Sequence, residues 1–137
     1  MLRVVDFRSF DPETFPDKAS LEDIEFWKML RKKYSERGHE DAAAEILESR
    51  GFNDVAQLVR MHRFSQVMKG FDTWEEKLLY YADKRVKHDK IVSLYERLED
   101  GRRRNMPDGE AEKESRKIEE KVYELERELA LVVGKQI

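Results

Sequence analysis

The segment from Glu110 to Val133 carries apolar residues at spacings of four, three, four and three. These residues are Ile118, Val122, Leu125, Leu129 and Val132. Such spacing puts them along one side of a helix, like the a and d positions of about two heptads. The sequence therefore predicts one long helix here. Its apolar side can pack against the protein's own core or against another chain, and both alternatives are open.

The composition favours a small, all-α protein. The chain has 137 residues, of which 42% are charged, with only 6 glycines and 3 prolines, and many of the charged residues favour helix. This length is typical of one domain, so a single domain is predicted over residues 1–137. Within it we distinguish an arm and helix at 1–38, a core at 39–105 and a long C-terminal helix at 110–134.

The charge and the absence of certain residues narrow the function classes. The net charge of -3 makes nucleic acid a poor partner. The lack of cysteine excludes disulfides and thiolate metal sites. No apolar run approaches the roughly 20 residues that a membrane span needs, and no signal peptide precedes Arg3 and Asp6. We therefore expect a cytoplasmic protein without membrane contact.

About six helices are predicted, at 20–37, 39–50, 53–62, 73–86, 93–103 and 110–133. An irregular arm at 1–19 precedes them, with a short strand at 2–7 and anchoring side chains at Phe7, Phe10 and Phe15. Capping boxes are predicted where Ser20, Thr73 and Ser93 precede an acidic residue by three positions. Gly51 and Gly38 are predicted helix stops, residues 64–72 a loop, and 107–109 a turn.

Each predicted helix has an expected inward side. The expected inward residues are Ile24, Trp27, Leu30 and Tyr34; Ala43, Ile46 and Leu47; Val55, Leu58, Val59 and His62; and Trp74, Leu78, Tyr81, Ala82 and Val86.

Several linked motifs follow one another between residues 39 and 98. His39 opens a helix that continues Glu-Asp-Ala-Ala-Ala-Glu-Ile-Leu, and Gly51-Phe52 follows. Next comes Val-Ala-Gln-Leu-Val-Arg-Met before His62, and then a helix that reads Thr-Trp-Glu-Glu-Lys-Leu-Leu-Tyr-Tyr-Ala-Asp-Lys from Thr73. In this order and spacing, the stretch resembles the distal half of an HD-domain metal-dependent phosphohydrolase. The resemblance implies an HD-like helical fold that is truncated on its N-terminal side.

The resemblance also implies roles for five residues. Asp83 matches a ligand of the primary metal. His39 and His62 match auxiliary histidines, which bind a second metal in binuclear members and contact the substrate phosphate in others. Lys84 and Arg85 are candidates for contact with that phosphate. The implied cofactor is a divalent transition metal (manganese, nickel, iron or zinc), with no cofactor as the alternative.

The proximal half of the family pattern is missing. Residues 1–38 contain no histidine, so the first metal-binding histidine and the adjacent His-Asp pair have no counterpart. The His88-Asp89 pair spells that signature, but it follows Asp83 and lies among Arg85, Lys87 and Lys90. We interpret it as a solvated, charged segment. A metal with so few protein ligands is a weak catalyst, so we expect weak or absent catalysis from this chain alone.

Simpler interpretations stand beside these roles. Asp83 can pair with Lys84 or Arg85, His62 can be a buried, hydrogen-bonded histidine, and His39 can be a helix-start residue. The run of arginines at 102–104 is typical of a solvated helix end, where cations complement the helix dipole.

Two function classes remain. The first is an HD-type hydrolase of nucleotides or small phosphoesters. The second is a degenerate HD scaffold that serves as a binding or oligomerisation module without catalysis. A metal site shared between two chains is a third option. A truncated HD domain leaves apolar surface uncovered. The arm at 1–19 and the helix at 20–37 can cover it, or a second copy can, and of these we expect a homodimer.

Overall fold

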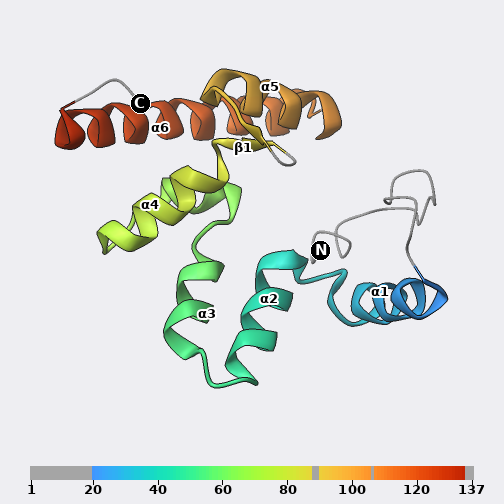
Figure 1. The fold of residues 1–137 in the computed structure, drawn as a ribbon. Coiled ribbons are helices and arrows are strands. Elements are labelled where there is room, and N and C mark those ends of the chain that lie inside the picture. Colours follow the sequence, from blue (N-terminus) through green and yellow to red (C-terminus); the bar gives the residue numbers. More distant parts are fainter. Residues whose placement is uncertain (1–19, 88–89, 106, 135–137) are drawn as a thin grey trace. The chain divides into compact units, whose positions relative to one another are not determined.

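The computed structural model describes residues 20–87, 90–105 and 107–134 (Figure 1). Over these residues the chain is mostly helical, with six α-helices, one short 3-10 helix and one two-stranded antiparallel sheet. The predicted all-α class is confirmed. The predicted arm at 1–19, with its strand and its three phenylalanines, lies outside the described residues, as does the His88-Asp89 pair.

The chain divides into two compact units between Arg60 and Met61. Each unit has a hydrophobic cluster of its own. The prediction of a single domain over 1–137, with the subdivisions given above, stays a prediction.

The first unit begins with α1 (Leu21–Tyr34). Its capping box is confirmed, because the Ser20 hydroxyl accepts a hydrogen bond from the Asp23 N–H at 3.1 Å and the Asp23 carboxylate accepts one from the Ser20 N–H at 3.0 Å. The predicted inward side is also confirmed. Trp27, Leu30 and Tyr34 are buried together with Ala42, and the partly buried Ile24 and Ile46 pack against them.

The other two helices of this unit are α2 (Gly38–Glu48) and α3 (Asn53–Arg60). Gly38 is thus the first residue of α2 rather than the end of α1. Gly51 stops α2 as predicted: it has a left-handed φ of 83°, and the Phe52 N–H donates to the Leu47 carbonyl at 3.0 Å. These features make a Schellman motif, which glycine adopts without a Cβ penalty.

The inward sides predicted for these two helices are correct in part. Ile46 packs against the core, and Leu47, Leu58, Val59 and His62 are partly buried. The buried residues of α2 are Ala42 and Ala44, not Ala43, and the buried residue of α3 is Ala56, whereas Val55 is 46% exposed. Because α2 contacts α1 on one side and α3 on the other, it buries two sides instead of the single side that was predicted. Alanine allows such close helix approach because its side chain is small.

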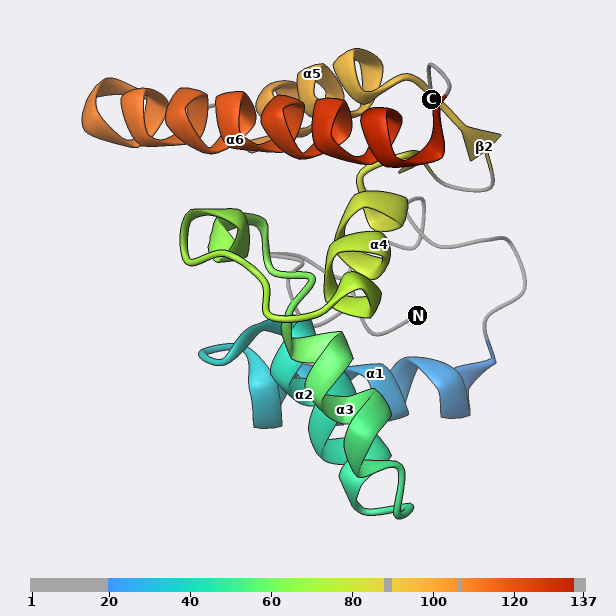
Figure 2. The ribbon, with the colours of Figure 1, turned by 90° about the vertical axis from the view of Figure 1, so that its left-hand side faces the viewer.

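The second unit contains a 3-10 helix η3 (Phe64–Met68), α4 (Trp74–Asp83), α5 (Leu94–Asn105) and α6 (Gly109–Val133), in the order seen in Figure 2. The predicted loop at 64–72 therefore contains a short helix. Four of the five residues of the predicted C-terminal seam, Ile118, Val122, Leu125 and Leu129, pack in the unit's own core, while Val132 is 64% exposed. Of the two alternatives for that seam, packing on the protein's own core is the one observed for these four residues.

The start of α4 agrees with the prediction, and its inward side agrees for Tyr81 alone. Thr73 and Glu76 form the predicted capping box. Tyr80 and Tyr81 are buried, whereas Trp74 and Leu78 are 46% and 53% exposed. Ala82 is exposed as well, and Val86 lies beyond the helix. The pattern of apolar residues predicted Tyr81 but missed Tyr80. Each tyrosine hydroxyl has an acceptor inside the unit, since Tyr80 donates to the Phe64 carbonyl and Tyr81 donates to Glu126, both at 2.8 Å.

A small hairpin between α4 and α5 was not predicted. It consists of β1 (Val86–Lys87) and β2 (Lys90–Ile91), paired antiparallel with Val86 opposite Ile91. With two residues in each strand, the sequence is too short to show the alternation that signals a strand.

Candidate functional site

The candidate site lies where α4 ends, in the second unit. Asp83 is the last residue of α4, Lys84 is its C-cap, and Arg85 leads into β1. The chain order alone thus brings the predicted metal ligand and the two predicted phosphate contacts to one place. Whether they perform those roles stays a prediction.

Lys84 is a buried cation with several partners. Only 6% of the residue is exposed. Its ammonium donates to the His62 carbonyl at 3.0 Å and to Asp83 Oδ2 at 2.7 Å, and it lies 4.5 Å from the centre of the Tyr80 ring. Burial of a charge is costly unless it is paired and hydrogen-bonded. These contacts offset that cost, and they fix Lys84 as a link between α4 and the segment around His62.

Asp83 is the more accessible partner of this pair, with 44% of its side chain exposed. Partial burial acts to raise its pKa. The charge and hydrogen bond of Lys84 act in the opposite direction, assisted by the charges of His62 and Arg97, and the net result is a pKa below the ordinary value of 3.8. Asp83 is therefore ionised at neutral pH, which is the state that a metal ligand requires.

Arg85 connects the end of α4 to the hairpin and to α6. Its Nε donates to the Val92 carbonyl at 2.8 Å, its Nη1 donates to the Tyr81 hydroxyl, and its Nη1 lies 3.6 Å from Glu126 Oε1. Each of these contacts uses a donor of the guanidinium group. The arrangement gives Arg85 a structural role in the described part of the second unit.

Sequence reasoning missed Arg97, which is 8% exposed and donates from Nε to the Val86 carbonyl at 2.9 Å. A signal was available in the sequence, because Arg97 and Leu98 follow Leu94 by three and four residues and therefore lie on the same side of α5 as this buried leucine. Together with Lys84 and Arg85 it places three cations at this end of α4, against the carboxylates of Asp83 and Glu126.

The two predicted histidines belong to different units. His39 is the second residue of α2, which agrees with the interpretation of His39 as a helix-start residue. Its Nδ1 lies 3.5 Å from Glu40 Oε2. His62 is a partly buried residue in the turn before η3, and its carbonyl, rather than its ring, accepts from Lys84. Asp83 and His62 together offer two donors from the second unit, whereas a catalytic zinc site has three protein ligands and an open position.

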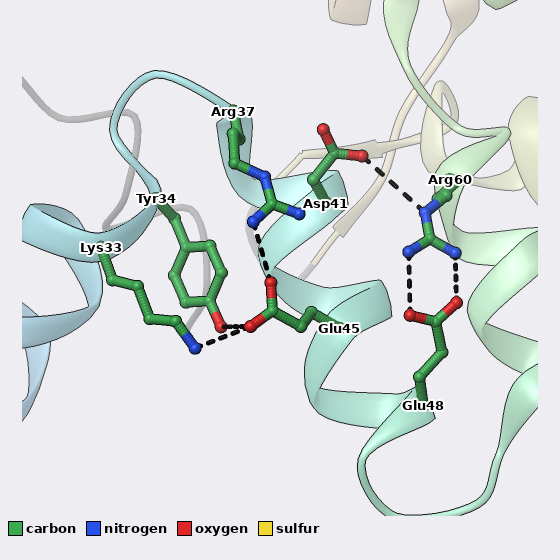
Figure 3. Close-up of polar contacts among 7 residues, drawn as sticks. All are labelled: Lys33, Tyr34, Arg37, Asp41, Glu45, Glu48 and Arg60. Carbon is green, nitrogen blue, oxygen red and sulfur yellow. Dashed lines mark hydrogen bonds and ion pairs between the residues drawn. The ribbon is translucent and has the colours of Figure 1, made fainter.

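The first unit contains a different polar cluster, which surrounds Glu45 on α2 (Figure 3). Glu45 Oε1 accepts from Lys33 Nζ at 2.7 Å and from the Tyr34 hydroxyl at 2.9 Å, and Oε2 accepts from Arg37 Nη1 at 2.9 Å. These donors, Lys33 first, lower the pKa of Glu45 from 4.5 to about 2. A carboxylate held in this way fixes α1 against α2 and is a poor proton acceptor.

Arg60 makes the matching connection between α3 and α2. Its Nη1 and Nη2 donate to the two carboxylate oxygens of Glu48 at 2.6 and 3.0 Å, and its Nε lies 3.9 Å from Asp41 Oδ1 (Figure 3). The hydrogen bonds from Arg60 lower the pKa of Glu48. Both clusters of Figure 3 therefore stabilise helix packing.

The arginine run at the end of α5 is paired with carboxylates nearby. Arg102 lies 3.4 Å from Glu119, Arg103 lies 2.9 Å from Glu99, and Arg104 pairs with Asp100. This agrees with the interpretation of the run as a charged helix end. The expectation that nucleic acid is not a partner stays a prediction.

Comparisons with models of known protein families, with curated proteins and with solved structures found no match. None of the helices in the described ranges is long and apolar enough to cross a lipid bilayer.

Proposed function

We propose that this chain is related to the HD-type metal-dependent phosphohydrolases of nucleotides or small phosphoesters, and that by itself it has weak or no turnover. The observation that carries this proposal is the pair formed by Asp83 and Lys84. Asp83 is ionised and 44% exposed, so it is able to bind a cation, but one of its oxygens already accepts a bond from a buried ammonium. A metal has to compete with that ammonium.

The donor set supports weak rather than strong metal binding. Asp83 and the His62 ring would be the ligands from the second unit, and both types suit divalent transition metals. When bound, such a metal would acidify a water and offset charge on a phosphate. These two donors fill only part of a metal's coordination sphere, and the charge of Lys84 opposes a second cation at Asp83.

Metal binding and turnover test the proposal directly. We would titrate the purified chain with Mn²⁺ by calorimetry and assay hydrolysis of p-nitrophenyl phosphate and of nucleotides in the same buffer. We expect weak, saturable binding that Asp83→Asn abolishes, with no metal-dependent turnover above background. Asp54→Asn, which removes an exposed carboxylate of α3, is the matched control and should bind Mn²⁺ like the parent chain.

Lys84→Met tests whether metal binding is weak because the Lys84 ammonium competes for Asp83 or because the protein ligands are few. Methionine fills a similar volume without charge, so Mn²⁺ affinity should rise by roughly tenfold, because the positive charge next to Asp83 is removed. Metal-dependent turnover that disappears in Asp83→Asn would show that the chain is a working hydrolase. Equal Mn²⁺ binding in the parent chain and in Asp83→Asn would remove Asp83 from any metal site.

A second candidate function is binding of a small phosphorylated molecule without catalysis, by a degenerate HD scaffold. The gathering of three cationic side chains at the α4 end, those of Lys84, Arg85 and Arg97, favours it, because phosphate groups are bound by such cations. Calorimetric titration with a nucleotide in the presence of a chelator distinguishes it from the first. Binding that survives the chelator and is weakened by Arg85→Met supports the scaffold, and no binding under those conditions removes it.

A further inference from the structure

We propose that α1 is a self-association surface, along which two copies of this chain pair antiparallel. The surface is a stripe of four residues: Glu22, Phe26, Met29 and Lys33. Their spacing of four, three and four places them on one side of the helix. This inference concerns the first unit and is independent of the function proposed for the end of α4.

The stripe is open to a partner. Phe26 is 45% exposed and Met29 is 56% exposed, and 59% of the Lys33 side chain is exposed. The unit's own core uses a different side of α1, formed by Trp27, Leu30 and Tyr34. Pairing along the stripe therefore leaves the packing of α1 on α2 intact.

The order of the side chains along the stripe identifies the partner as a second copy. From Glu22 to Lys33, the stripe consists of an acidic residue, two apolar residues and a basic residue. When two such helices run antiparallel around a two-fold axis, Glu22 lies opposite Lys33 of the second copy and Phe26 lies opposite Met29 of the second copy. Both contacts then occur twice, as in any isologous interface. Parallel pairing would instead bring like charges together.

The rest of α1 has the same polarity. Its first turn is acidic at Glu22 and Asp23, and its last turn is basic at Arg31, Lys32 and Lys33. The C-terminal half of α1 is therefore its basic half. An antiparallel second copy brings its acidic first turn towards this basic half, which adds long-range attraction in the same orientation.

Lys33 can take part without leaving its place in the first unit. Its ammonium lies 2.7 Å from Glu45 Oε1, and an ammonium group has three donors. A second carboxylate can therefore be bound while the contact with Glu45 is kept.

The contact is small, so the dimer should be weak. A helix of 14 residues is roughly 21 Å long, and one such helix pair buries less than the ~1,200 Å² of a stable interface. We expect a monomer–dimer equilibrium that depends on protein concentration.

Sedimentation equilibrium of the full chain from micromolar to millimolar concentration tests the proposal. Phe26→Glu and Met29→Lys each place an uncompensated charge against an apolar residue, and each should weaken dimerisation by at least about tenfold. An equimolar mixture of the two variants should dimerise like the parent chain, because the new glutamate then lies opposite the new lysine and the other Phe26–Met29 contact is intact. Restoration in the mixture also shows that both variants are folded.

Leu131→Glu is the matched control, since Leu131 is an apolar residue of α6 that is 83% exposed. It should dimerise like the parent chain. A parent chain that is monomeric at every concentration would overturn the proposal. So would variants that dimerise as the parent chain does, or a mixture in which dimerisation is not restored.

Discussion

Replacement of Tyr80 by phenylalanine isolates the hydrogen bond that joins α4 to η3. Tyr80 is fully buried, and its hydroxyl donates to the Phe64 carbonyl at 2.8 Å. Its ring lies 5.0 Å from the ring of Phe71, centre to centre, and phenylalanine keeps that contact. Burial raises the pKa of Tyr80 above its ordinary value of 10, with a further contribution from the charge of Asp83. The hydroxyl therefore stays protonated and remains a donor throughout the useful pH range.

The size of the effect follows from the carbonyl that is left behind. Tyr80→Phe removes the donor but leaves the Phe64 carbonyl in place, and an unsatisfied buried acceptor costs about 1–3 kcal/mol. We expect a loss of about 2 kcal/mol in the free energy of unfolding. A loss of this size lies well outside the ±0.5 kcal/mol that is typical of surface substitutions.

Urea unfolding followed by circular dichroism measures this loss as a lower midpoint with an unchanged slope. Tyr95→Phe is the matched control, because Tyr95 is 60% exposed on α5 and the change should be within about 0.5 kcal/mol. Equal stability of Tyr80→Phe and the parent chain would refute the reasoning. It would mean that the Phe64 carbonyl finds water or another donor, and that the inward orientation of Tyr80 depends on its ring alone.

Two further predictions concern the core of the second unit and the acid response of the first. Val122→Ala removes two carbon atoms from a fully buried position and should lower the free energy of unfolding in urea by about 2–3 kcal/mol. This value combines about 0.8 kcal/mol for each carbon with a cavity contribution. Leu131→Ala is the control, because Leu131 is 83% exposed, and it should lower the free energy of unfolding by less than about 0.5 kcal/mol. The pKa of Glu45 is lowered from 4.5 to about 2, so its stabilising contribution is present above pH 4.5 and is lost as the pH falls through 2. Acid unfolding followed by circular dichroism should therefore show a weaker pH dependence over this window in Glu45→Gln, and identical acid profiles would contradict the role of the cluster in Figure 3.

Local features of the helices could be predicted from the sequence because they depend on neighbouring residues. The capping boxes at Ser20 and Thr73 and the stop at Gly51 need only residues within one or two turns. The seam of α6 was predictable for a related reason, since a long helix repeats its pattern often enough to define one side. For four of its residues that side is the buried one.

The inward sides of the shorter helices could not be predicted in the same way. In α2 the spacing of apolar residues suggests one buried side, but contacts with α1 and α3 bury two. In α4 the sequence offers Trp74 and Leu78 as core residues beside Tyr81, yet only Tyr81 of these is buried, together with Tyr80, and acceptors outside the helix satisfy the hydroxyls of both tyrosines. The position of a hydrogen-bond partner 16 or 45 residues away is not encoded in local spacing.

The candidate site likewise has some features that depend on neighbouring residues and others that depend on tertiary contacts. The sequence by itself determined that Asp83, Lys84 and Arg85 stand together at the end of a helix, because they are consecutive residues. Only the tertiary structure decided that Lys84 is buried under the His62 carbonyl, that Arg85 and Arg97 hold the hairpin, and that Asp83 keeps its charge. The physical reason is that the pKa and exposure of an ionisable group depend on the charges and dipoles around it in space, and these come from segments that are far apart in the chain.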